Sequence, residues 1–213
     1  MSNHPPIYLT PPSTPAIREA IRAGKLAAIA TPAQGNRITA DYPAWCADNG
    51  AFTGRYPGDE AYLRWLKTMR PYADQCLFVT APDVVGNHWA TLARSRDMLP
   101  RIRDMGFPAG FVAQNFMEYC TWDPWEEIDC LFLGGDTAWK LGEEAANLAA
   151  VAASMGIWVH MGRVNSRRRY QYAAAIGCHS VDGTYLTYAP DANLPTVLSW
   201  ARDTAAQPPL FHL

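Results

Sequence analysis

Short, uninterrupted apolar runs recur along this chain, and polar residues stand where they end. Examples are CLFVTAPD, GFVAQN, CLFLGGD and IWVHMGR, which carry Asp83, Gln114, Asp136 and His160. Runs that are apolar on both faces are typical of buried parallel strands. In parallel α/β folds, functional groups gather at the carboxyl ends of the strands. The repeated placement of polar residues at these ends therefore predicts an enzyme.

Eight such runs can be assigned as strands, which is the number in a (β/α)8 barrel. They cover residues 7–10, 27–31, 44–47, 76–80, 110–113, 130–133, 157–160 and 180–182. Helices are predicted at 14–23, 59–69, 87–105, 142–155, 166–176 and 194–205, with Pro100 kinking or splitting the third. The connection 32–43 is too short and polar for a helix, and 116–128 is irregular. We predict a compact (β/α)8 TIM barrel, with an open doubly wound sheet as the alternative.

The composition agrees with one enzyme-sized domain spanning residues 1–213. Hydrophobic residues make up 49% of the 213 residues and charged residues 18%, which favours a large core over disorder. The net charge of −2 gives no global attraction to nucleic acid, so such binding needs a local basic patch. Five scattered cysteines without a C-x-x-C pair predict reduced thiols and no zinc site. We find no signal peptide or membrane span, and expect a cytoplasmic protein.

Two aspartates at predicted strand ends are the candidate catalytic groups. Asp182 ends the last strand and precedes Gly183, while Asp48 stands in A-D-N-G-A-F. Each of these short sequences could equally form an ordinary turn. Neither aspartate, taken alone, favours a catalytic role over that structural interpretation. If both carboxylates converge on one barrel mouth, one can attack a substrate while the other moves protons.

Other strand-end residues are candidates for substrate contact. Gly134 and Gly135 permit close approach to the backbone and expose N–H donors, although a tight turn explains them equally well. The Gln114 amide suits the edge of a heterocycle. A lone histidine such as His160 is more often a hydrogen-bonded structural residue, and no paired histidines suggest a metal.

Four arginines follow the seventh predicted strand. In barrels, the loops after the seventh and eighth strands often bind phosphate, and the guanidinium group matches phosphate geometry. The alternative is a solvated helix start, which the helix dipole disfavours for cations. We therefore predict phosphate or nucleic-acid contacts from Arg163, Arg167, Arg168 and Arg169. Trp122, Trp125 and Trp139 stand in or beside polar loops and could stack on a base.

Taken in order, these blocks resemble the tRNA-guanine transglycosylases and their DNA-modifying relatives of phages and bacterial defence clusters, which insert 7-deazaguanines. A-D-N-G-A-F is similar to the family's D-S-G-G-F-Q block, which implies a general acid/base role for Asp48. A-P-D implies that Asp83 recognises the guanine edge, and F-V-A-Q-N gives Gln114 a related role. L-G-G-D is similar to G-G-L-A, whose glycine backbone contacts the base, here Gly134 and the amide of Gly135.

The strongest block is H-M-G-R-V, followed by a helix ending A-I-G and then S-V-D. It resembles the family's H-x-M-G-V-G, helix, A-x-x-x-G, F-D sequence. The resemblance implies that His160 and Met161 lie at the substrate and that Asp182 is the glycosyl nucleophile. It also implies base exchange without a cofactor, with the 7-deazaguanine base as co-substrate.

The chain departs from the family in two places. The C-x-C-x-x-C zinc subdomain is missing, and G-T-Y-L replaces P-T-R after the nucleophile. No zinc site is expected, and DNA becomes a better expected partner than tRNA. A homodimer is possible by the same resemblance. Two alternatives stay open: a metal-dependent barrel hydrolase using Asp48, Asp83, His160 and Asp182 as ligands, and a non-catalytic nucleic-acid-binding barrel.

Overall fold

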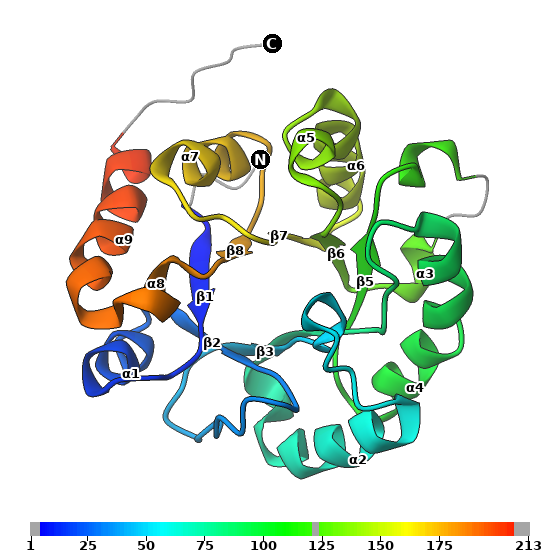
Figure 1. The fold of residues 1–213 in the computed structure, drawn as a ribbon, viewed down its shortest axis with the longest axis horizontal. Helices are drawn as coiled ribbons and strands as arrows, with labels where there is room; N and C mark the ends of the chain where they lie inside the picture. Colours follow the sequence, from blue (N-terminus) through cyan, green and yellow to red (C-terminus); the bar gives the residue numbers. More distant parts are fainter. Residues whose placement is uncertain (1–4, 121–123, 207–213) are drawn as a thin grey trace.

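The computed structural model describes residues 5–120 and 124–206, and these form a closed barrel of eight parallel strands surrounded by helices (Figure 1). Each strand pairs with the next, and the eighth pairs with the first. The strands are β1 (Ile7–Thr10), β2 (Ala27–Ala30), β3 (Trp45–Ala47), β4 (Cys76–Thr80), β5 (Ala109–Ala113), β6 (Cys130–Leu133), β7 (Trp158–Met161) and β8 (Ser180–Asp182). The predicted TIM barrel is confirmed, and each predicted strand agrees to within about a residue at either end.

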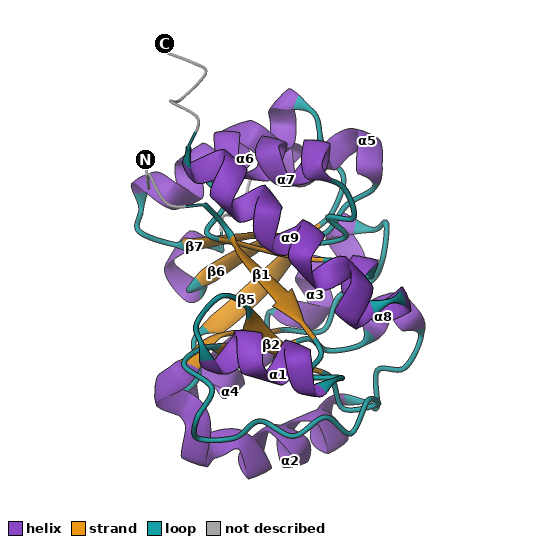
Figure 2. Ribbon diagram, turned by 90° about the vertical axis from the view of Figure 1, so that its left-hand side faces the viewer, coloured by secondary structure: helices purple, strands orange, loops and turns teal. Residues whose placement is uncertain are grey.

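The helices lie outside the strands and cover the barrel wall (Figure 2). The described part of the chain contains α1 (Pro15–Arg22), α2 (Asp59–Met69), α3 (His88–Ser95), α4 (Met98–Asp104), α5 (Thr137–Lys140), α6 (Glu143–Ser154), α7 (Arg167–Ala175), α8 (Tyr185–Tyr188) and α9 (Pro190–Ala205). Single 3-10 turns occur at Ala51–Thr53, Met117–Tyr119 and Trp125–Glu127, and a longer segment runs over Arg70–Gln75. None of the described helices is long and apolar enough to cross a bilayer.

The predicted helix at 87–105 is divided into α3 and α4, as Pro100 suggested. The break falls before the proline, so Pro100 occupies the first turn of α4. A first-turn residue has no intrahelical acceptor for its N–H, which makes proline acceptable there. The connection 32–43 contains no helix, as expected. The four-residue helices α5 and α8 were not predicted.

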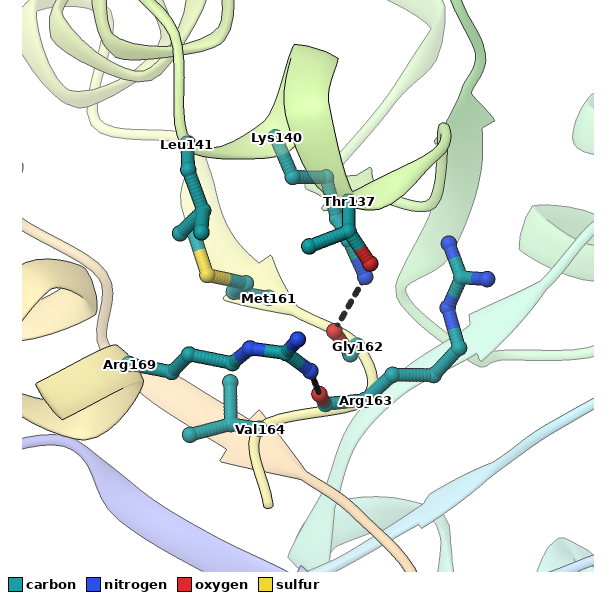
Figure 3. A pocket seen from close by; sticks show the side chains of 8 residues that line it. All are labelled: Thr137, Lys140, Leu141, Met161, Gly162, Arg163, Val164 and Arg169. Carbon is teal, nitrogen blue, oxygen red and sulfur yellow. Dashed lines mark hydrogen bonds between the residues drawn. The ribbon is translucent and has the colours of Figure 1, made fainter. Parts of the chain in front are cut away.

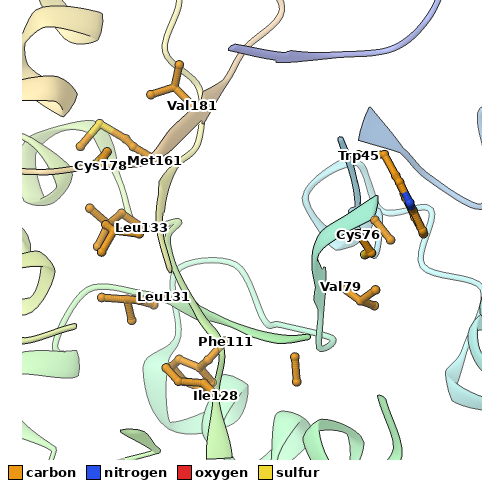
Figure 4. Close-up of a cluster of buried hydrophobic side chains, with 14 of the residues drawn as sticks. Trp45, Cys76, Val79, Phe111, Ile128, Leu131, Leu133, Met161, Cys178 and Val181 are labelled. Atoms are coloured by element: carbon orange, nitrogen blue, oxygen red, sulfur yellow. The ribbon is translucent and has the colours of Figure 1, made fainter. Parts of the chain in front are cut away.

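Side chains pack in two separate apolar layers. One fills the barrel interior and consists of Leu9, Ala27, Ile29, Cys46, Phe78, Val112, Cys130 and Phe132. The larger one lies between the strands and the helices and includes Phe111, Leu131, Leu133, Met161 and Val181 (Figure 4). Alternate residues of each strand face the two layers, as barrel geometry requires. This alternation decides which strand-end residues can reach the barrel mouth.

Candidate active site

Asp182 and Asp48 stand at the carboxyl ends of β8 and β3. Both lie in the inward-facing register, two residues beyond the interior residues Ser180 and Cys46. The Asp182 side chain is 24% exposed, so it is in contact with solvent at the mouth. The predicted convergence of two carboxylates on one end of the barrel is therefore present in the structure.

The Asp182 carboxylate is held through one of its two oxygens. Its Oδ1 lies 3.0 Å from Nε2 of His160, and the described residues give this carboxylate no second hydrogen bond. Its backbone carbonyl accepts from Val164 N. A Cβ on Gly183 would lie 2.3 Å from Asn165 Oδ1 and 2.6 Å from Val164 O, so this close approach requires glycine. Gly183 thus has a packing role beyond that of an ordinary Asp-Gly turn.

Asp48 has a strongly altered acidity. Burial raises its pKa to about 7, and the neighbouring negative charges of Asp182 and Asp83 act in the same direction. A hydrogen bond from Gly50 N to Oδ1, at 2.7 Å, opposes part of this increase. A carboxyl group with a pKa near neutrality can both give and take a proton at physiological pH. Such chemistry suits a general acid/base.

Asp83 and Gln114 are brought together, but they bind mainly to each other. Gln114 Nε2 donates to Asp83 Oδ2 at 2.9 Å, and Asn49 Nδ2 donates to Asp83 Oδ1 at 3.0 Å. Gln114 Oε1 accepts from Gly86 N at 3.0 Å. Asp83 is 6% exposed and Gln114 2%, and burial raises the pKa of Asp83. Asn49 was not singled out in the sequence, although it anchors this network.

The two glycines allow close packing but do not offer free amides. The N–H groups of Gly134 and Gly135 both donate to Ala113 O, at 2.9 and 3.0 Å. A Cβ on Gly134 would lie 2.5 Å from Val112 Cγ1, and one on Gly135 would lie 2.4 Å from Trp139 Cε3. The expected donation from the Gly135 amide to a base is therefore wrong for this structure, because the strand-end turn already uses that N–H.

His160 and Met161 do not lie at the solvent-facing surface of the site. His160 is fully buried in the barrel interior, with its ring centroid 4.4 Å from that of Phe132 and 5.1 Å from that of Phe78. Both of its ring nitrogens have protein partners. Met161 faces the opposite way, into the outer core (Figure 4). Strand alternation turns Met161 away from the barrel interior, whereas His160 faces inward but is completely buried, so neither side chain is exposed for substrate contact.

The four arginines do not form one phosphate-binding cluster. Arg163, at φ 61°, donates to the carbonyls of Gly134 and Gly135 and lies 4.8 Å over the Phe52 ring. Arg169 donates to Arg163 O, and its side chain lies apart from that of Arg163 (Figure 3). Arg167 pairs with Asp203 of α9 at 3.0 Å. Arg168 is exposed on α7. Helical spacing and strand-end turns send these side chains in different directions, so the four do not converge on one site, and phosphate contact by the exposed Arg168 stays a prediction.

Lys140 was missed in the sequence. This α5 residue is only 3% exposed, and its Nζ donates to Gly162 O at 2.5 Å (Figure 3). Burial, followed by the nearby Arg163 charge, lowers the pKa of Lys140 to about 7, while the Asp182 charge opposes this. It lines a small cavity formed by Thr137, Leu141, Met161, Gly162, Arg163, Val164 and Arg169.

Exposed aromatic residues also lie in the connections beyond the barrel strands, with Trp89 in the first turn of α3. Phe52, Trp89, Phe116 and Tyr119 follow β3, β4 and β5, and each is more than half exposed. Phe116 adopts a left-handed conformation, with φ 77°. In contrast, Trp125 and Trp139 are buried, and Trp139 donates to Glu118, which corrects their predicted base stacking. Trp122 lies outside the described residues.

Within residues 5–120 and 124–206, no three His, Cys, Asp or Glu side chains lie close enough together to hold a metal ion. The four ligands of the hydrolase alternative therefore do not form a ready metal site in this arrangement. Cys46, Cys76, Cys130 and Cys178 are buried free thiols.

Comparison with known proteins adds evidence on the fold. No protein-family profile and no curated protein matches the chain. Among solved structures, the BexX/CysO complex of Amycolatopsis orientalis aligns over 97% of this chain and 94% of that chain, with 13% identity and a TM-score of 0.58. The native structure of KDPGal aligns over 97% and 93%, with 14% identity and a TM-score of 0.58.

A third structure, the EAL-domain protein YkuI of Bacillus subtilis in complex with c-di-GMP and calcium, aligns less completely. It covers 79% of this chain and 45% of that chain, with 16% identity and a TM-score of 0.50. At such low identities these similarities support the barrel fold alone. The function has to be argued from the site.

Proposed function

We propose that this protein is a base-exchange transglycosylase that replaces guanine in DNA with a 7-deazaguanine. One observation carries the proposal: two inward-facing carboxylates share the barrel mouth in different electrostatic environments. Asp182 is hydrogen-bonded through Oδ1 alone, while burial raises the pKa of Asp48 to about 7. Unlike environments for two carboxylates allow one to act as nucleophile and the other as acid and base. The order of sequence blocks resembling the tRNA-guanine transglycosylases supports the same assignment.

In the proposed reaction, an Asp182 oxygen attacks C1′ of the target nucleotide. The bond between C1′ and N9 breaks, guanine leaves with the electron pair, and protonated Asp48 supplies the proton that neutralises it. A covalent glycosyl-enzyme remains. The incoming 7-deazaguanine then loses its N9 proton to Asp48 and attacks C1′, which releases Asp182 and restores both carboxyl groups. No proton is gained or lost overall.

The surroundings of the carboxylates suit a nucleobase held outside a duplex. Asp83 and Gln114 form a nearby polar pair, and a carboxylate oxygen can accept further bonds after Asn49 and Gln114 have donated. The exposed Phe52, Phe116 and Tyr119 provide flat apolar surfaces on which neighbouring bases can stack. Extrusion of a paired base costs a few kcal/mol, which such stacking offsets in part.

The test is incubation of the protein with DNA and a 7-deazaguanine base, followed by digestion and mass spectrometry of the nucleosides. The wild type should produce a modified deoxynucleoside. Asp182→Asn should lower the rate by at least about 10³-fold, because it removes the nucleophile. Asp74→Asn is the matched control, since Asp74 is exposed and stands just before β4, at the opposite end of the strands.

Trapping the intermediate gives a second readout. Without an incoming base, wild-type protein should form a DNA–protein adduct that survives denaturation, and Asp182→Asn should not. Product formed equally well by Asp182→Asn would refute the assignment of the nucleophile. Product formed only with tRNA would keep the reaction but change the substrate, and no product with either would favour a binding role.

A further inference from the structure

A continuous hydrogen-bonded chain of side chains leads through the barrel interior to Asp182. Trp158 Nε1 lies 2.7 Å from Ser180 Oγ, and Ser180 Oγ lies 2.8 Å from His160 Nδ1. His160 Nε2 then lies 3.0 Å from Asp182 Oδ1. Ser180 and His160 are fully buried. β7 contributes Trp158 and His160, and β8 contributes Ser180 and Asp182, so two neighbouring strands hold the whole chain.

The direction of this chain follows from the donors available. An indole N–H can only donate, so Ser180 Oγ accepts from Trp158. The single hydroxyl hydrogen of Ser180 must then find an acceptor, and His160 Nδ1 is its other partner. If Nδ1 accepts, the one proton of a neutral ring resides on Nε2. That proton points at Asp182 Oδ1, which accepts it.

The opposite direction is less favourable. If Nδ1 carried the proton, Ser180 Oγ would accept twice and its hydroxyl hydrogen would have no acceptor among the described residues. A buried donor without a partner costs about 1–3 kcal/mol. Nε2 would then face Asp182 as an acceptor, and the carboxyl group would have to be protonated to bond with it. A protonated Asp182 is a poor nucleophile.

We propose that Trp158 and Ser180 are positioning residues that fix the proton of His160 on Nε2, and that this proton keeps Asp182 Oδ1 bound and Oδ2 available for attack. The nucleophilic role of Asp182 rests on the proposed function, whereas the location of the proton does not. Burial disfavours the charged form of His160 and lowers its pKa, which agrees with a neutral ring. The charged groups acting on His160 are Asp182 and Lys140, and Phe78 and Phe132 pack against its ring.

The direct test is nitrogen-detected NMR of protein labelled with 15N-histidine, with His160 identified from the spectrum of His160→Gln. In the wild type at pH 7, Nε2 should show the shift of a protonated nitrogen and Nδ1 that of an unprotonated one. Ser180→Ala should convert His160 to a mixture of tautomers, and Trp158→Phe should do so to a smaller extent. A wild-type ring protonated on Nδ1, or on both nitrogens, would overturn the proposal.

Kinetics supply a readout that a merely structural role would not give. Ser180→Ala should lower kcat about 10- to 100-fold and leave KM within about twofold, because substrate contacts are unchanged. Ser154→Ala is the matched control, since Ser154 is exposed and bonds only within α6. An unchanged kcat in Ser180→Ala would overturn the positioning role.

The failures of the two proposals can be told apart. If wild-type protein carries the Nε2 proton but exchanges no base, the proposed function fails and the proton assignment stands. If base exchange occurs with an Nδ1 proton, the proposed function stands and the positioning role fails.

Discussion

The two walls of the barrel mouth hold their carboxylates in opposite ways. On the β7–β8 wall, Asp182 bonds to His160 through one oxygen and keeps the other free. On the β4–β5 wall, both oxygens of Asp83 accept from side-chain amides of Asn49 and Gln114. An oxygen without a partner is available to attack a reacting atom, whereas Asp83 is held in place by an amide on each oxygen and has only its remaining lone pairs to offer a substrate. The contrast assigns chemistry to one wall and shape to the other.

Asp48 stands between these two cases. Its Oδ1 accepts from Gly50 N within its own turn, and both Asp182 and Asp83 influence its acidity. Their combined negative charge favours the protonated form of Asp48. The three carboxylates therefore act on one another, even though only Asp83 is held by a closed network of side chains.

The largest effect on stability is expected on the β4–β5 wall. Asn49→Ala removes the amide bonded to Ala81 O and Asp83 Oδ1, and the acceptor for Ala51 N. Leaving these buried groups unpaired should cost about 2–4 kcal/mol in urea unfolding. Asn36, which is only partly buried and whose side chain forms a solvent-exposed bond to Gln34, is the control and should cost less than about 0.5 kcal/mol as alanine. Equal losses of stability in the two variants would show that the Asn49–Asp83 hydrogen bonds do not give the β4–β5 wall its structural role.

A smaller, pH-dependent effect is expected at Asp48. Its pKa is raised to about 7 in the folded state from 3.8, so folding favours the protonated form. The stability that this provides is complete below pH 4 and is lost as the pH rises through 7. At pH 8 the free energy of unfolding of Asp48→Asn should therefore exceed that of the wild type by about 2 kcal/mol, and the difference should vanish near pH 4. Thermal unfolding across this range is the measurement, and a pH-independent difference would contradict it.

The smallest effect is expected away from both walls. Arg167 pairs with Asp203 at the surface, where side-chain exposures of 53% and 39% leave the charges well solvated. Arg167→Ala should change the free energy of unfolding by less than about 0.5 kcal/mol. It should also leave the salt dependence of DNA binding unchanged, since its guanidinium faces α9. A flatter salt dependence would restore Arg167 to the phosphate-binding set.

The barrel itself could be predicted from the sequence because its strands are buried on both faces. Runs such as CLFV and CLFL are apolar throughout, and few other elements have that pattern. The bounds of α7 were also predicted to within a residue, and in the structure Ser166 caps this helix by accepting from Arg169 N. The four-residue helices α5 and α8 have no periodicity long enough to detect.

The candidate site was less accessible to sequence analysis. Strand ends identified Asp48 and Asp182, but they could not show that Met161 faces the outer core while His160 faces inward. Ser180 stands in the S-V-D block but was assigned no role there, and Lys140 stands in no motif; the importance of both follows from burial and from partners far away in sequence. Arg163 and Arg167 are close in sequence, yet the first contacts glycine carbonyls and the second pairs with α9.

Closure of the barrel also determines when the site can exist during protein synthesis. β1 pairs with β8, with Leu9 opposite Asp182 and Ile7 opposite Ser180. A nascent chain carries Asp48 and Asp83 long before Asp182 has left the ribosome, and until then β1 has an unpaired edge. The mouth that brings Asp48 and Asp182 together should thus be among the last parts to assemble. Translation that stops before β8 would leave β1 and β7 with unpaired edges and the barrel mouth without Asp182.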